Sequence, residues 1–226
     1  VGDVALSELA PAIAASGASP DLALIGQLAS AGGIVGTPEI SPDSIVHLEH
    51  GAPWERAIHD ARMLRHQLGN VSGPVCNSSL HDLLGMSSEA AANWSVPVGR
   101  SPVAVAIPVN DRQLQFVPRK RNPAGRRFEL ARFLGEYLSP STQKAHWLAS
   151  TDLSTFRQKY QRAFAAEFLC PIDSLTSFLG GDFSSYAIEE AAAEFDVSEK
   201  TIESLLLNNG YVHHHGADSL PYRMAA

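Results

Sequence analysis

Cysteine is scarce in this sequence: Cys76 and Cys170 are the only two among 226 residues, and they do not form a Cys-x-x-Cys motif. This pair excludes a disulfide-dense secreted scaffold, and we expect two buried structural thiols in a reducing compartment. Long apolar runs are also absent, since no stretch approaches the ~20 residues that a membrane-spanning helix needs. The chain does not open with a basic segment followed by an apolar one, so we expect a cytoplasmic protein.

Positive charge is in short supply, with 17 Lys and Arg against 24 Asp and Glu and a net charge of -7. This balance argues against a surface that binds nucleic-acid phosphates along its whole length. One local exception comprises Arg112, Arg119, Lys120, Arg121, Arg126 and Arg127. A transcription regulator that reads DNA with the loop at 119–127 therefore stays open as an alternative, and its binding would weaken steeply with salt.

The chain is long enough to bury a substantial core, and its hydrophobic periodicity changes along its length. Helical spacing is found at 4–15, 20–31 and 53–68, with a proline-containing linker at 37–43. The β-rich runs at 102–107 and 113–117, separated by Asn110-Asp111, predict an antiparallel hairpin. Helical spacing returns at 125–138, at 154–169 and in a final pair at 186–195 and 199–208.

These patterns predict an α+β fold that is mostly helical with a small antiparallel sheet. We divide the chain into a helical N-terminal region with its linker at 1–50, a main domain at 51–212 and a polar tail at 213–226. The tail contains His213, His214 and His215, a run more typical of a surface segment than of a metal site. The final helix pair has the spacing of a helix-turn-helix, but its second helix is poor in base-reading side chains, so packing is the better interpretation.

Several stretches of the main domain match one known pattern in the same order. They are PWERA at 53–57 with ARMLR at 61–65, RRFELA at 126–131, FAAEFLCP at 164–171, and AEFDVS at 193–198. Together they resemble the ImmA/IrrE-type metallopeptidase domain family over residues 50–212. The resemblance implies a zincin-like architecture, in which two long helices hold a zinc ion.

The family's zinc motif, His-Glu-x-x-His, follows the Arg-Arg-Phe run directly. Two imidazoles at i and i+4 bind zinc and the glutamate polarises the metal-bound water. Here the ligand and base positions hold Arg132, Phe133 and Glu136, and the third-ligand positions hold Gln158 and Tyr160. An arginine does not ligate a cation and a phenylalanine is no base, so we expect neither a cofactor nor catalysis.

We expect a remnant cleft formed by Arg132, Phe133, Glu136, Gln158, Tyr160 and Glu167. Arg132 would replace the charge of zinc and pair with Glu136 or Glu167, although an ordinary i,i+4 ion pair with Glu136 is the simpler interpretation. The resemblance implies a regulator of the mobile-element or stress type, whose active relatives cut a repressor. We therefore expect a catalytically inactive, metallopeptidase-like regulatory protein that binds a protein partner or ligand through this cleft.

An active metal-dependent peptidase with a different ligand set is the remaining alternative. Glu136 and His146 are candidate ligands, as are His59 and His66, which lie seven residues apart on one predicted helix. His59 and His66 lack a third partner in the sequence, so solvated surface histidines are the simpler interpretation of that pair.

Overall fold

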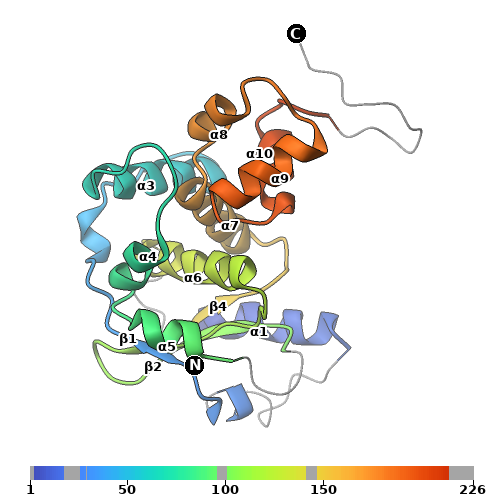
Figure 1. Ribbon diagram of the computed structural model, residues 1–226. Helices are drawn as coiled ribbons and strands as arrows, with labels where there is room; N and C mark the ends of the chain where they lie inside the picture. Colours follow the sequence, from blue (N-terminus) through green and yellow to red (C-terminus); the bar gives the residue numbers. More distant parts are fainter. Residues whose placement is uncertain (1–2, 18–25, 29, 96–100, 141–146, 214–226) are drawn as a thin grey trace.

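The computed structural model describes residues 3–17, 26–28, 30–95, 101–140 and 147–213. Most of the helix predicted at 20–31 lies outside them. Figure 1 shows α1 (Asp3–Ala15), α3 (Pro53–Gln67), α4 (Asn77–Leu83), α5 (Ser88–Asn93), α6 (Pro123–Leu138), α7 (Phe156–Leu169), α8 (Ile172–Leu179), α9 (Ser185–Glu194) and α10 (Glu199–Asn208). The strands are β1 (Ile34–Gly36), β2 (Ala104–Pro108), β3 (Leu114–Val117) and β4 (Leu148–Ser150). None of the described helices is long and apolar enough to cross a membrane.

The strands form one antiparallel sheet in the order β1-β3-β2-β4. The pairing of β2 with β3 confirms the predicted hairpin, and the mixture of helices with a small antiparallel sheet confirms the α+β class. The two outer strands are three residues long and were not predicted. One of them, β1, comes from the N-terminal region, so the sheet includes residues from both sides of position 50.

Alternation along the strands directs side chains to two separate cores. Ala104, Ala106 and Phe116 belong to the core shared with α6, whereas Val105 and Val117 belong to a second core. That second core includes the apolar face of α1, contributed by Ala5, Leu9, Ala12 and Ile13. The sheet is thus covered by α1 on one face and by α6 on the other.

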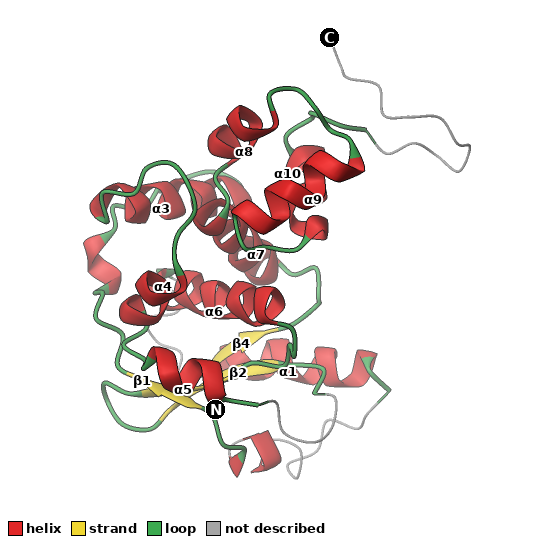
Figure 2. Ribbon diagram, viewed as in Figure 1, coloured by secondary structure: helices red, strands yellow, loops and turns green. Residues whose placement is uncertain are grey.

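Helix α6 is the centre of the larger core, between the sheet and the helices α3 and α7 (Figure 2). Its start is fixed by Pro123 in the first turn and by the Asn122 side chain, which accepts a hydrogen bond of 2.6 Å from the Gly125 amide. On the sheet side, the Phe133 ring lies 5.8 Å from the Phe116 ring. On the other side Gly135 permits close approach of α7, because an added Cβ would lie 2.6 Å from the Phe164 ring.

Helices α3 and α7 pack side by side with their N-termini at the same end. In the first half of α7, Tyr160 donates a 2.6 Å hydrogen bond to Asp60 in the middle of α3. Near their ends, Arg65 donates a 2.6 Å hydrogen bond to the Phe168 carbonyl. The order of these contacts makes the two helices parallel.

The helices α9 and α10 confirm the predicted final pair, while α8 and α5 were not predicted. Arg127 of α6 binds this region to the core, since its Nη1 donates to the carbonyls of Phe195 and Asp196 at 2.8 and 2.9 Å. The same guanidinium donates through Nη2 to the Val75 carbonyl. Buried Ile202, Leu205 and Leu206 show that one face of α10 serves packing.

We predict that Phe164→Ala lowers the free energy of unfolding by ~3–5 kcal/mol, because the ring is fully buried and its removal leaves a cavity. The ring stacks on Tyr160 and Phe168, with centroids 6.4 and 5.8 Å away. Urea denaturation measures the change, with Phe156→Ala as a control at a position that is 73% exposed. A loss below ~1 kcal/mol at Phe164 would contradict this packing.

Candidate functional site: a buried polar cluster beside a pocket

The predicted cleft residues come from α6 and α7, and each is at most 4% exposed. The structure does not gather them into one cleft. Phe133 lies on the sheet side of α6 against Phe116, away from α7. Glu167 lies in the last turn of α7, where its carboxylate forms an ion pair of 2.6 Å with Arg62. The remaining members are Arg132, Glu136, Gln158 and Tyr160.

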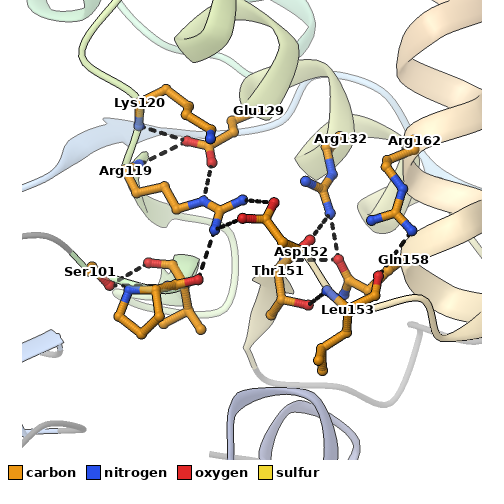
Figure 3. A network of polar contacts seen from close by, with 12 residues as sticks. Ser101, Arg119, Lys120, Glu129, Arg132, Thr151, Asp152, Leu153, Gln158 and Arg162 are labelled. Atoms are coloured by element: carbon orange, nitrogen blue, oxygen red, sulfur yellow. Dashed lines mark hydrogen bonds and ion pairs between the residues drawn. The ribbon is translucent and has the colours of Figure 1, made fainter. Parts of the chain in front are cut away.

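Arg132 is bound to neutral acceptors. Its Nη2 donates to Gln158 Oε1 at 2.5 Å and to the Thr151 carbonyl at 2.7 Å (Figure 3). The Gln158 side chain also accepts a hydrogen bond from the Thr151 amide at 2.8 Å. Burial lowers the pKa of Arg132 to about 10, and the nearby Arg162 adds to this effect.

These contacts correct the predicted ion pairs of Arg132. Among the described residues, the ion pairs of Glu136 and Glu167 are with Arg157 and Arg62, and neither is with Arg132. A local i,i+4 interaction is weak when exposed. In the buried interior, contacts with α7 and with the segment after β4 take the place of the local ion pair.

Glu136 is fully buried and receives its countercharge from α7. It forms an ion pair with Arg157, and Gln161 Nε2 donates to Glu136 Oε2 at 2.9 Å. Gln161 also donates to the Ala149 carbonyl at 2.9 Å, which links this group to β4. Both of these partners were missed by sequence reasoning.

A third group comprises Tyr160, Asp60 and His47. Tyr160 Oη donates to Asp60 Oδ2 at 2.6 Å, and His47 Nδ1 lies 2.9 Å from the same oxygen. Burial, together with the Asp60 carboxylate, raises the pKa of Tyr160. Asp60 could have been identified from the sequence as a buried polar residue, because it lies between Ala57 and Leu64 on the buried face of α3.

Three of the six basic residues considered for DNA binding are engaged inside the protein, while Arg112, Lys120 and Arg121 are exposed. Arg119 Nε donates to Glu129 at 2.7 Å, and its Nη2 donates to Asp152 at 2.5 Å (Figure 3). Arg126 donates to the Trp94 carbonyl at 2.8 Å, and Arg127 is buried between Val75 and the end of α9. These three arginines are therefore engaged by acceptors of the chain itself.

A pocket of about 410 Å³ lies beside Glu136. We call it the Glu136 pocket, and its polar lining consists of Glu8, Arg56, Glu136, Ser139, Thr155, Arg157 and Tyr160. Of the predicted cleft residues only Glu136 and Tyr160 line it. Glu167 instead lines a second, larger hollow of about 820 Å³ near α8.

The residues present do not fit the zinc ion that the resemblance implies. Arg132 places a buried cation where the first ligand would be, and Phe133 directs an aromatic ring into the sheet-side core. Within the described part of the chain, no three His, Cys, Asp or Glu side chains lie close enough to hold a metal. His59 Nε2 lies 2.9 Å from the Val46 carbonyl, and His146, His214 and His215 lie outside the described residues.

The two cysteines have opposite environments, which corrects the expectation that both are buried. Cys170 is buried, and desolvation raises its pKa to about 12. Cys76 is exposed at the start of α4. Hydrogen bonds from Ser78 and Ser79 lower its pKa to about 7.

A scan against protein-family models, a search of curated proteins and a search of solved structures each gave no match for this chain. Function is therefore inferred from the residues and their geometry. The geometry consists of buried polar groups joining α6 to α7 and an adjacent pocket with two arginines.

We predict that Gln158→Ala destabilises the protein by ~2–4 kcal/mol, because it leaves the buried Arg132 and the Thr151 amide short of an acceptor. Urea denaturation measures the effect, and Gln67→Ala, at an exposed glutamine, serves as the control. Gln158→Leu should lower the free energy of unfolding by less in an Arg132→Met background than in the unmodified protein. Equal costs in both backgrounds would contradict the coupling between the two side chains.

Proposed function

We propose that this chain is a catalytically inactive protein of metallopeptidase-like, zincin-type architecture that binds a protein partner through the Glu136 pocket. One observation carries the proposal: Arg132 and Glu136, which hold two positions of the family's zinc motif, are bound by other side chains and carbonyls of the protein. Arg132 is bound by Gln158 and the Thr151 carbonyl, and Glu136 is paired with Arg157.

Hydrolysis by the family's route needs a group that activates water and a group that accepts its proton. The position of the general base is Phe133, whose ring is fully buried. Glu136 is fully buried as well, and its charge is balanced by Arg157. Among the described side chains at these positions, the charged ones neutralise each other inside the protein. None of them is placed to act as a base on a substrate.

Binding is supported by the surroundings of the pocket. Phe156, which lines it, is 73% exposed, and Trp54 beside Pro53 is 46% exposed. Lys159 Nζ lies 6.0 Å from the Trp54 ring and 5.8 Å from the Phe156 ring, so the two aromatic residues flank one lysine. Exposed aromatic side chains beside a hollow are typical of the anchor points of protein interfaces.

The DNA-binding alternative has less support. Arg119, Arg126 and Arg127 are engaged by acceptors within the protein, as described above. A reader of DNA needs such side chains free to reach phosphates and base edges.

We predict that the protein retains peptides from a mixed library without cleaving them. Phe156→Ala should reduce retention at least ~10-fold, because an exposed aromatic anchor carries much of the binding free energy. Tyr186→Ala, at a 69% exposed residue of α9, is the matched control and should change little. Mass spectrometry of the retained and released peptides measures both outcomes.

Two results would contradict the proposal. The first is cleavage of the library at a rate that scales with protein concentration. The second is retention that is insensitive to Phe156→Ala but lost in Tyr186→Ala, which would place the binding surface on α9.

A further inference from the structure

The Glu136 pocket lies where two parallel helices begin. Its lining includes Pro53, the first residue of α3, and Phe156, the first residue of α7. The first turn of a helix presents amide hydrogens without intrahelical acceptors and carries a partial positive charge. Two such ends beside one pocket favour a negatively charged occupant.

Each of these helix starts also supplies an arginine to the pocket lining. Arg157, in the first turn of α7, has a side chain that is 10% exposed and forms its ion pair with Glu136. Its Nε and Nη1 are buried and have no hydrogen-bond partner within the described part of the chain. Arg56, in the first turn of α3, takes part in none of the ion pairs between described residues.

The protein already places a carboxylate from a separate segment at this position. Glu8 of α1 lines the pocket and is 6% exposed. Its Oε2 accepts a 3.0 Å hydrogen bond from the hydroxyl of Thr155, the N-cap residue of α7. The pocket therefore has the geometry to hold a carboxylate at the start of α7.

We propose that the Glu136 pocket receives a carboxylate side chain from an acidic segment of a protein partner, with Arg56 and the start of α7 as its receptors. The inference rests on the proposed function and names the chemistry of the partner. Glu8 is then an internal competitor, because its carboxylate lies at the same helix end. A volume of about 410 Å³ accommodates one such side chain and its neighbouring backbone.

The lining carries two carboxylates, Glu8 and Glu136, and two arginines, Arg56 and Arg157, so an incoming carboxylate that displaces Glu8 preserves the charge balance. Glu136 is matched by Arg157, and Glu8 is held by a neutral hydroxyl together with the helix end. Arg56, which takes part in none of the ion pairs between described residues, is the cation that would bind the incoming carboxylate. Because the groups already held here are carboxylates, a glutamate or aspartate side chain is favoured over a phosphate.

The test uses the whole chain and a fluorescent hexapeptide with two glutamates, beside a twin in which both are glutamine. Fluorescence anisotropy at low salt should give at least ~10-fold tighter binding of the acidic peptide. Arg56→Gln should reduce the affinity for the acidic peptide to that of the twin. Glu8→Gln, which keeps a hydrogen-bond acceptor for Thr155, should increase the affinity for the acidic peptide by about threefold or more.

Arg112→Gln, at an exposed arginine away from the pocket lining, is the matched control and should bind as the unmodified chain does. Thermal melts of Arg56→Gln and Glu8→Gln establish that both variants are folded. Neither substitution breaks an ion pair between described residues, so native melting is expected.

The outcomes separate this inference from the proposed function. Equal affinity for the two peptides, unchanged by Arg56→Gln but reduced by Phe156→Ala, would overturn the carboxylate site and leave peptide binding standing. Displacement of the acidic peptide by equimolar inorganic phosphate would overturn the choice of carboxylate over phosphate. Binding of neither peptide, even by Glu8→Gln, would overturn the inference together with the proposed function.

Discussion

The structure depends on charged groups that are buried between α6 and α7. Arg132 and Glu136 are one turn apart on α6, and both are almost fully excluded from water. A buried charge without a partner is strongly destabilising, so each must be met by groups from neighbouring elements. Gln158 meets Arg132 and Arg157 meets Glu136, which fixes both the rotation and the position of α7 against α6. Through the contacts of Tyr160 and Arg65, α7 in turn fixes the parallel packing of α3.

The helices could be predicted because their signals are local. Asn122 and Thr155 cap α6 and α7, and both helices carry apolar residues at helical spacing. The outer strands could not be predicted, because each is three residues long and pairs with a distant segment. Ile34 of β1 pairs with Phe116, for example, and such contacts leave no local pattern.

The same distinction between local and long-range signals applies to the candidate site. The polar residues on α6 could be chosen from the sequence, and the resemblance placed Gln158 in the same cleft, but the contact of Gln158 with Arg132 and the roles of Arg157 and Gln161 were not predicted. Local spacing favoured an ion pair between Arg132 and Glu136, whereas the actual hydrogen-bond partners on α7 are Gln158 and Gln161, 26 and 25 residues away. The Glu8 contact with Thr155 spans 147 residues and was beyond any sequence argument.

Arg157, Gln158 and Gln161 thus provide the countercharge and the hydrogen bonds of the buried Glu136 and Arg132. The function proposed above requires no metal ion in the Glu136 region. Elemental analysis by mass spectrometry on tag-free protein, with a zinc titration beside it, measures whether the chain holds a metal ion. We expect far less than one metal ion per chain and no measurable affinity for zinc. One tightly held metal ion per chain, lost in Glu136→Gln, would contradict this expectation.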